Sequence, residues 1–261
     1  MIKTLTATRY VTPLREGGSL PAIVEADDGQ LYVMKFTGAG QGVKALIAEL
    51  VAGEIAQLLG LRVPEIVFLT LDPAIGRSEP DAEIQDLLQA SVGLNLGLRY
   101  LSKASAFSIL LESVPLDSQL ASKIVWFDAY VTNVDRTSRN VNLLLWQQSL
   151  WLIDHGATLY FHHDWNDYLA RSQSPFPLIA QHALISLASR LPEVDTALRP
   201  KLTPTALHHI VDLIPEQWLG DERIFANTTE QREAYVTYLI RRLDASTMFV
   251  EEAVRAHTQS V

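Results

Sequence analysis

The sequence predicts an α+β protein with a β-rich N-terminal part, which contains one main helix, and a mostly helical C-terminal part. Two observations predict this division. Short apolar runs bounded by turn residues recur in the first part of the chain, which is typical of strands. Apolar residues at steps of three and four dominate the remainder, which is typical of helices. The change falls near residue 103, so we expect domains at residues 1–103 and 104–261.

The first part contains four predicted strands and a helix. LPAIVEA (20–26) and LYVMKF (31–36) are joined by DDGQ, in which Asp28-Gly29 is a strong hairpin signal. The segment VKALIAELVAGEIAQLLG (43–60) has helical spacing and ends at a glycine. The other two predicted strands are EIVFLTL (65–71) and LGLRYLS (96–102), and the stretch between them predicts a loop and a short helix.

The second part begins with PLDSQLASKIVWFDAYVT (115–132), whose apolar spacing predicts a helix. A hairpin follows, in which LLLW and LWLI flank a short turn. We expect further helices near 176–190, 203–213 and 229–256. One stripe of the last helix carries Tyr235, Leu239 and Leu243, which favours a core position over a dimer face. The oligomeric state stays open.

Composition and charge narrow the class of protein. The 261-residue chain is 48% hydrophobic and 20% charged, which is typical of globular proteins. Its net charge of −9 argues against nucleic acid as the principal partner. No apolar run approaches the roughly 18 residues of a membrane span, and the N-terminus lacks the layout of a signal peptide. With no cysteine, these features favour a cytoplasmic protein that has no membrane partner.

Three polar residues surround the predicted hairpin: Asp135, Asn140 and Asp154. If the turn centres on Gln147, Asn140 and Asp154 face each other with Cα atoms on the order of 5 Å apart. An amide oxygen and a carboxylate at this spacing suit Mg²⁺. Asp135, on the preceding loop, can then orient a hydroxyl beside a metal-bound phosphate. The alternative is that these residues only form turns.

Two charged residues lie in largely apolar elements of the first part. Lys35 is on a predicted strand, and Glu49 is on the following helix, where its own stripe consists of alanine and glycine. An ion pair with Glu49 can hold Lys35 in the position where it binds a phosphate. The alternative is an ordinary surface ion pair. The loop before the first strand carries Gly17, Gly18 and Ser19, which permit close approach of a phosphate but equally suit a turn.

Several other classes of site lack their key residues. There is no GxxxxGK[ST] loop and no GxGxxG fingerprint. The adjacent histidines of FHHDW (161–165) point apart on a strand, which favours a structural or substrate-side role over zinc binding. There is no GxSxG elbow to present a serine nucleophile.

The order of these parts resembles a protein-kinase-like fold. NVDRTSRN with IDHG is similar to the HipA-like kinases, and more distantly to the phosphoinositide lipid kinases. EADDG, WFDAYVTNVDRTSRNVNLLLW and LWLIDHGATL resemble the short, stand-alone HipA-like kinase domains in particular. The resemblance covers about residues 10–165 and departs from related patterns at Thr137 and His155. It implies a two-lobed fold whose lobes are the two parts above.

The resemblance also implies a role for each candidate residue. Asp135 is then the catalytic base, and Asn140 and Asp154 hold Mg²⁺. Lys35 contacts the ATP phosphates and is held in place by Glu49. The loop that covers these phosphates contains Gly17, Gly18 and Ser19. We therefore expect an Mg-ATP-dependent phosphotransferase whose preferred acceptor is a Ser/Thr hydroxyl of a protein. A kinase for small molecules or lipids, and a nucleotide-binding pseudokinase or scaffold, are the alternatives.

Overall fold

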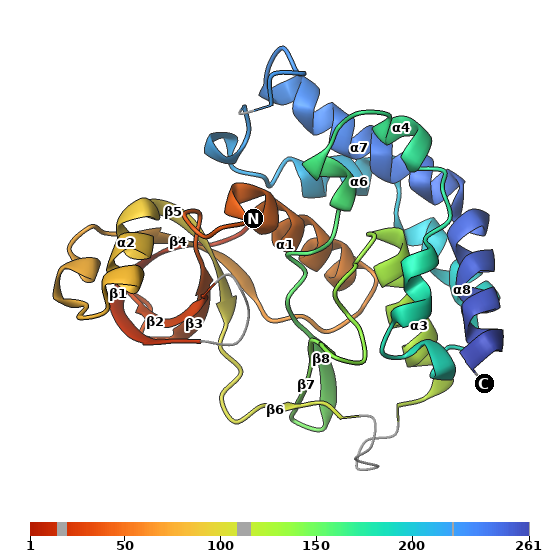
Figure 1. The fold of residues 1–261 in the computed structure, drawn as a ribbon, viewed down its shortest axis with the longest axis horizontal. Helices are drawn as coiled ribbons and strands as arrows, with labels where there is room; N and C mark the ends of the chain where they lie inside the picture. Colours follow the sequence, from red (N-terminus) through yellow and green to blue (C-terminus); the bar gives the residue numbers. More distant parts are fainter. Residues whose placement is uncertain (15–19, 109–115, 221, 261) are drawn as a thin grey trace.

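The N-terminal part of the chain forms a closed barrel, at the left of Figure 1. The computed structural model describes residues 1–14, 20–108, 116–220 and 222–260. Around the barrel the strand order is β1-β2-β3-β5-β4. These strands are β1 (Thr4–Pro13), β2 (Ala22–Ala26), β3 (Leu31–Lys35), β4 (Ile66–Leu71) and β5 (Gly93–Arg99).

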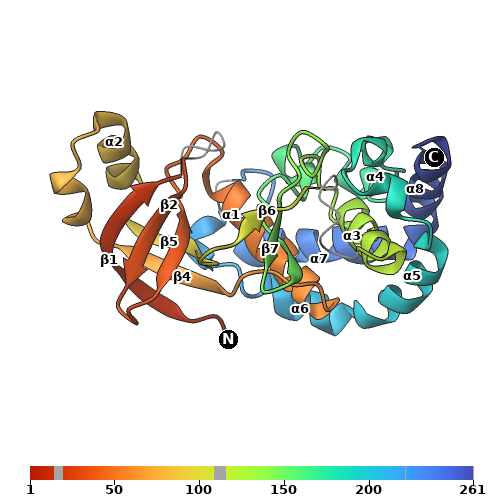
Figure 2. The ribbon, with the colours of Figure 1, turned by 90° about the horizontal axis from the view of Figure 1, so that it is seen from below.

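The barrel interior has its own apolar core. Its members include Val24, Tyr32, Met34 and Leu69, which alternate along their strands with side chains of the outer face. The predicted β2–β3 hairpin is confirmed, and Gly29 occupies its turn with φ of 73°. Helix α2 (Ala82–Ala90) packs Ile84 and Leu88 against this core. In Figures 1 and 2, α2 lies at the side of the barrel far from the other helices.

Strand β1 was not predicted, although it closes the barrel. It pairs antiparallel with β2 and parallel with β4. Within β1, Ala7 is the residue that is buried. Because most β1 side chains contact solvent, the strand lacks the apolar pattern on which the prediction of strands depends. Its pairing rests on backbone hydrogen bonds to neighbours on both sides.

Helix α1 (Gly42–Leu58) lies between the barrel and the helical part (Figure 1). Its apolar residues share a second core with the outer face of β4 and β5 and with the helices that follow. Gly53 makes this packing possible: a Cβ atom there would lie only 2.5 Å from Ile66 Cδ1. The predicted stripe of small residues therefore does bring the helix close to the sheet.

The C-terminal part is mostly helical, with a small sheet at the junction (Figure 2). The sheet has the order β6-β7-β8. It consists of β6 (Ser105–Ala106), β7 (Leu143–Trp146) and β8 (Ser149–Leu152). The α-helices are α3 (Ser118–Tyr130), α4 (Tyr168–Arg171), α5 (Leu191–Leu198), α6 (Pro204–Val211), α7 (Thr228–Asp244) and α8 (Ser246–Ser260). Within the described ranges, the 3₁₀ helices are η1 (Ile75–Ser78), η2 (Tyr160–His163), η3 (Pro177–Gln181), η4 (Ile185–Leu187), η5 (Arg199–Lys201) and η6 (Glu216–Trp218).

Two predicted helices are wrong in part. The segment 176–190 forms only η3 and η4, because His182 between them is extended and its ring bonds Asp128. The predicted helix 229–256 is instead two helices that meet at Ala245, where Ser246 is buried beside Asp195. Tyr235 and Leu239 do lie in the core. Across the described ranges, no helix is long and apolar enough to span a membrane.

Candidate active site

The predicted ion pair between Lys35 and Glu49 is present. Lys35, at the end of β3, places its Nζ 2.5 Å from Oε2 of Glu49 on α1. The exposed fractions of the two side chains are only 11% and 1%. Burial alone would raise the pKa of Glu49, but the Lys35 ammonium and the His155 contact outweigh it and lower that pKa to about 2. Glu49 is therefore ionised in the fold.

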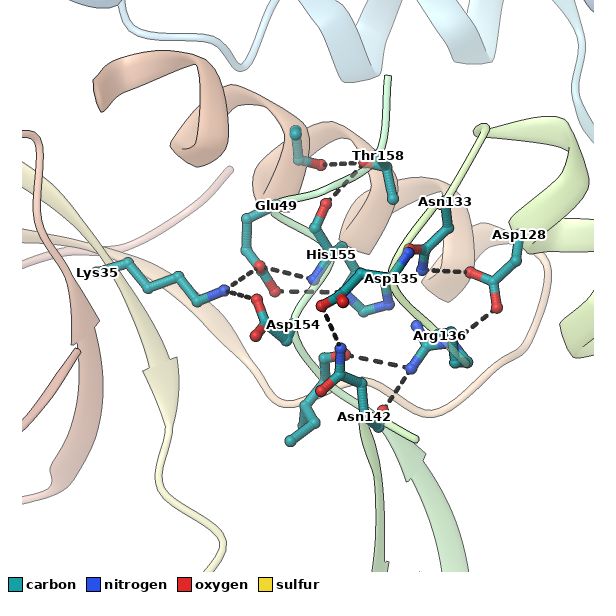
Figure 3. A network of polar contacts seen from close by, with 12 residues as sticks. Lys35, Glu49, Asp128, Asn133, Asp135, Arg136, Asn142, Asp154, His155 and Thr158 are labelled. Carbon is teal, nitrogen blue, oxygen red and sulfur yellow. Dashed lines mark hydrogen bonds and ion pairs between the residues drawn. The ribbon is translucent and has the colours of Figure 1, made fainter. Parts of the chain in front are cut away.

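Lys35 also binds Asp154, so the lysine bridges two carboxylates (Figure 3). The Lys35 Nζ to Asp154 Oδ1 distance is 2.6 Å, and the Asp154 side chain is 47% exposed. Burial would lower the pKa of Lys35, but Glu49 and Asp154 together raise it above its ordinary value. Three residues far apart in the sequence therefore meet at one charged centre, which opens to solvent at Asp154.

His155 fixes the backbone beside Asp154. The His155 amide donates to Glu49 Oε2 at 2.8 Å, and its Nδ1 lies 3.2 Å from Glu49 Oε1. The ring is buried and packs edge-on against Phe127. Asp154 itself has φ of 58°, a conformation that aspartate tolerates better than most residues. His155, where the sequence departs from related kinase patterns, therefore has a structural function: it connects the segment after β8 to α1.

Asp135 lies on the loop after α3, where three asparagines bind it. Its amide donates to Asn133 Oδ1 at 3.0 Å. Its Oδ2 accepts from Nδ2 of Asn140 at 2.7 Å and from Nδ2 of Asn142 at 3.0 Å. The structure thus joins Asp135 to the predicted Asn140, and it adds Asn142, which sequence reasoning did not single out.

The hairpin register explains why Asn142 was missed. The turn is Gln147-Gln148, with φ of 49° and 59°, as two-residue hairpin turns require. Trp146 pairs with Ser149 and Leu143 with Leu152. The predicted pairing of Asn140 with Asp154 is therefore wrong by one residue. It is Asn142 whose carbonyl accepts from the Ile153 amide, at 3.1 Å.

A second buried network lies beneath this loop, and its centre is Asp128 on α3 (Figure 3). Asp128 Oδ2 accepts from Arg136 Nε at 2.7 Å and lies 2.9 Å from His182 Nε2, while Oδ1 accepts from Asn133 Nδ2 at 2.8 Å. Burial opposes ionisation of Asp128, but Arg136 and His182 hold its pKa well below the usual range. An acidic residue within a largely apolar helix was the available sequence signal, as it was for Glu49.

Arg136 connects this network to the hairpin. Its Nη1 donates to the carbonyl of Asn142 and, at 3.3 Å, to the carbonyl of Ile153. The Arg136 side chain is completely buried. The residue after Asp135 thus contacts the backbone immediately before Asp154, and one guanidinium holds both segments.

The remaining predictions differ in outcome. Gly17, Gly18 and Ser19 lie outside the described residues. In FHHDW, His162 is buried with its Nδ1 3.0 Å from the Tyr235 hydroxyl, and burial lowers its pKa well below the ordinary value. Over the described ranges, no cluster of three or more His, Cys, Asp or Glu side chains could hold a metal ion.

The predicted oxygen ligands nevertheless suit a hard cation. Asp154 uses Oδ1 for Lys35, and Asn140 uses Nδ2 for Asp135. Within the part of the chain that the structure describes, neither Asp154 Oδ2 nor Asn140 Oδ1 has a hydrogen-bond donor. Mg²⁺ is bound in proteins by one or two such groups together with phosphate oxygens, so the donor set fits this ion.

Solved structures define the class of fold. The chain is similar to the Helicobacter pylori proinflammatory kinase CtkA, with a TM-score of 0.56 and 13% identity over 100% of both chains. It is also similar to the Golgi casein kinase with Mn/ADP bound, with a TM-score of 0.53 and 12% identity over 99% of this chain and 76% of that one. The fold is therefore a two-lobed kinase-like α+β fold, as predicted.

The family follows from the sequence match. The model of the HipA-like kinase family matches residues 8–251, so the chain belongs to the HipA-like kinases. The resemblance seen in NVDRTSRN and in the hairpin sequence is confirmed, and the match extends well beyond them. A comparison with curated proteins found no match.

Proposed function

We propose that the protein is an Mg-ATP-dependent kinase that transfers the γ-phosphate of ATP to a Ser/Thr hydroxyl of a protein. The observation that carries this proposal is the Lys35 ammonium bonded to both Glu49 and Asp154. A buried carboxylate fixes the lysine, while the half-exposed Asp154 keeps an oxygen for a cation. Such a centre can bind a phosphate and its metal together.

Each residue then has a defined role. Lys35 binds the ATP phosphates, and Glu49 holds the lysine in place. Asn140 and Asp154 hold Mg²⁺, which when bound neutralises phosphate charge as the phosphoryl group transfers. Asp135 accepts the proton of the acceptor hydroxyl and orients it. Gly17, Gly18 and Ser19 are proposed to cover the phosphates.

One of the similar solved structures supports both the proposed cofactor, a nucleotide with a divalent metal, and the proposed protein acceptor. The Golgi casein kinase structure contains Mn/ADP, which supports use of a nucleotide with a divalent metal. Its name also identifies a kinase of a protein, which supports a protein acceptor here. The chain's net charge of −9 disfavours an anionic lipid surface as the acceptor. All of Lys35, Asp135, Asn140 and Asp154 are present, which disfavours a pseudokinase.

The test compares wild type with Asp135→Asn. Purified protein is incubated with Mg-ATP and dephosphorylated casein, and phosphate transfer is followed by intact-mass spectrometry of both proteins. We expect transfer by wild type and a loss of about 10²- to 10⁴-fold in the variant, because general-base catalysis contributes about that much. Equal transfer by the two proteins, or none by wild type, would contradict the proposal. Thermal unfolding of both proteins controls for loss of structure.

A further inference from the structure

The two amides that bind Asp135 differ in their surroundings. Both donate to the same oxygen, Oδ2. Asn140 is exposed, whereas Asn142 is half-buried. Among the described residues, no donor contacts Asp135 Oδ1. The two asparagines therefore hold one oxygen of the carboxylate and leave the other for a substrate.

The backbone of Asn142 is held much more firmly than that of an ordinary loop residue. Its carbonyl accepts from the Ile153 amide at 3.1 Å and from Arg136 Nη1. Arg136 is itself buried and paired with Asp128. The φ of Asn142 is 49°, a left-handed conformation that asparagine tolerates because its short side chain bonds locally. The Asn142 amide is thus a donor at a fixed position.

Asn140 cannot hold Asp135 by the same means. Its side chain is exposed, and its Oδ1 belongs to the oxygen set that suits a metal ion. Any movement of Asn140 toward a ligand changes its contact with Asp135. Asn142 is attached instead to the buried Asp128–Arg136 pair, which ligands do not reach.

We infer that Asn142 is a positioning residue for the phosphotransfer reaction: it fixes Asp135 Oδ2, so that Oδ1 is directed at the acceptor hydroxyl. The inference rests on the proposed function and adds a residue to it. Because the Asn142 amide is fixed, Asn140 can bind the metal ion while the Asp135 carboxylate keeps its orientation. Preorganisation of this kind affects the rate of phosphoryl transfer in the bound complex more than the affinity for ATP.

The test uses two substitutions at Asn142 with matched controls at Gln147. Asn142→Gly removes the amide and keeps the left-handed backbone accessible; Asn142→Asp keeps the shape but replaces the donor by a carboxylate. Gln147 is exposed, lies in the same hairpin and has the same φ of 49°, so Gln147→Gly and Gln147→Glu reproduce the backbone and charge changes away from Asp135.

We expect kcat for transfer from Mg-ATP to dephosphorylated casein to fall about 10- to 100-fold in Asn142→Gly, because hydrogen bonds to charged groups are strong. In Asn142→Asp, kcat should fall by at least the same factor, because the new carboxylate repels Asp135. The KM for ATP and the Kd for Mg-ADP stay within about twofold of wild type, as do all constants of the Gln147 variants. A kcat of Asn142→Gly or Asn142→Asp equal to wild type would overturn the inference.

A double-mutant cycle separates positioning from a general effect on structure. In the Asp135→Asn background, Asn142→Gly changes the residual rate by less than about twofold, because the interaction with the carboxylate is already lost. A further 10-fold fall there would show that Asn142 acts through the fold, and would overturn the inference. If Asp135→Asn is as active as wild type, the proposed function fails; if only the Asn142 variants are fully active, this inference alone fails.

Discussion

Two buried carboxylates organise this molecule, and each is joined to one strong cation and one histidine. Glu49 binds Lys35 and His155, and Asp128 binds Arg136 and His182. The first cluster continues to Asp154, whose side chain is 47% exposed. The second is closed, since the side chains of Asp128, Arg136 and His182 are at most 2% exposed.

This difference separates two uses of the same chemistry. A buried charge pair that opens to solvent at one end can exchange a partner for a ligand. A closed pair can only hold chain segments together, because removing one member leaves the other without solvent or partner. We therefore propose ligand binding for the Glu49 cluster and fixation of the loop for the Asp128 cluster, and three measurements test this distinction.

The largest effect is expected at Asp128. Asp128→Asn removes the charge that compensates Arg136, which is completely buried. We expect the free energy of unfolding to fall by about 3–5 kcal/mol, the usual cost of breaking a buried pair, as measured by urea denaturation. Glu65→Gln is the matched control: its pair with Lys3 has the same 2.7 Å distance but is exposed, so the change should be about 0–1 kcal/mol. Similar losses in both variants would contradict the closed character of the Asp128 cluster.

A somewhat smaller effect is expected at Glu49, and it depends on pH. The pKa of Glu49 is lowered from 4.5 to about 2. A carboxyl with a depressed pKa stabilises the fold above its unfolded pKa, and this contribution disappears as the pH falls from about 4.5 toward 2. The shift corresponds to about 3 kcal/mol. Glu49→Gln should therefore be about 3 kcal/mol less stable than wild type at pH 7.

The two proteins should converge as the pH falls through this window, when urea denaturation is repeated at several acidic pH values. Comparing wild type with Glu49→Gln cancels the titration of the other carboxyls, which both proteins share. A stability difference that is constant between pH 7 and pH 3 would show that Glu49 is not held ionised by Lys35.

The smallest effect concerns the nucleotide. Glu49→Gln should weaken binding of Mg-ADP by about 10-fold, equivalent to about 1.4 kcal/mol, because Lys35 loses the carboxylate that fixes it. Asp128→Asn, under conditions where it is folded, should leave the affinity within about twofold. Isothermal titration calorimetry measures both. Equal losses in the two variants would remove the distinction between a ligand-binding cluster and a structural one.

Much of the fold and part of the candidate site could be predicted from sequence patterns. Lys35 and Glu49 were detectable because each is a charged residue in a largely apolar element, and because the small residues around Glu49 bring its helix close to the sheet. Asp128 carried the same kind of signal, but it lies before the NVDRTSRN motif and not within it, so it was predicted only as part of a helix. The division near residue 103 and the roles of the site residues stay predictions.

Other features could not be predicted because they depend on distant partners. Strand β1 is mostly exposed and is stabilised by pairing with β4, about sixty residues away in the chain. The break at Ala245 and the extended His182 result from side chains that bond Asp195 and Asp128. The hairpin register differs by one residue from the predicted one, because the turn is Gln147-Gln148. As a result, Asn142 lies opposite Ile153, and Asn140 does not pair with Asp154.

The amino-acid sequence was sufficient to predict the class of fold, the family and a set of polar residues that could carry phosphate chemistry. Periodicity, turn residues and short motifs are local properties, so the order of residues is enough to define them. Only the folded chain shows which of these groups share an ion pair or a hydrogen-bond acceptor: Lys35 lies between two carboxylates, and Asp135 accepts from two amides. Such contacts depend on distances of a few ångströms between residues as many as 119 positions apart, and only the packing of the whole chain sets those distances.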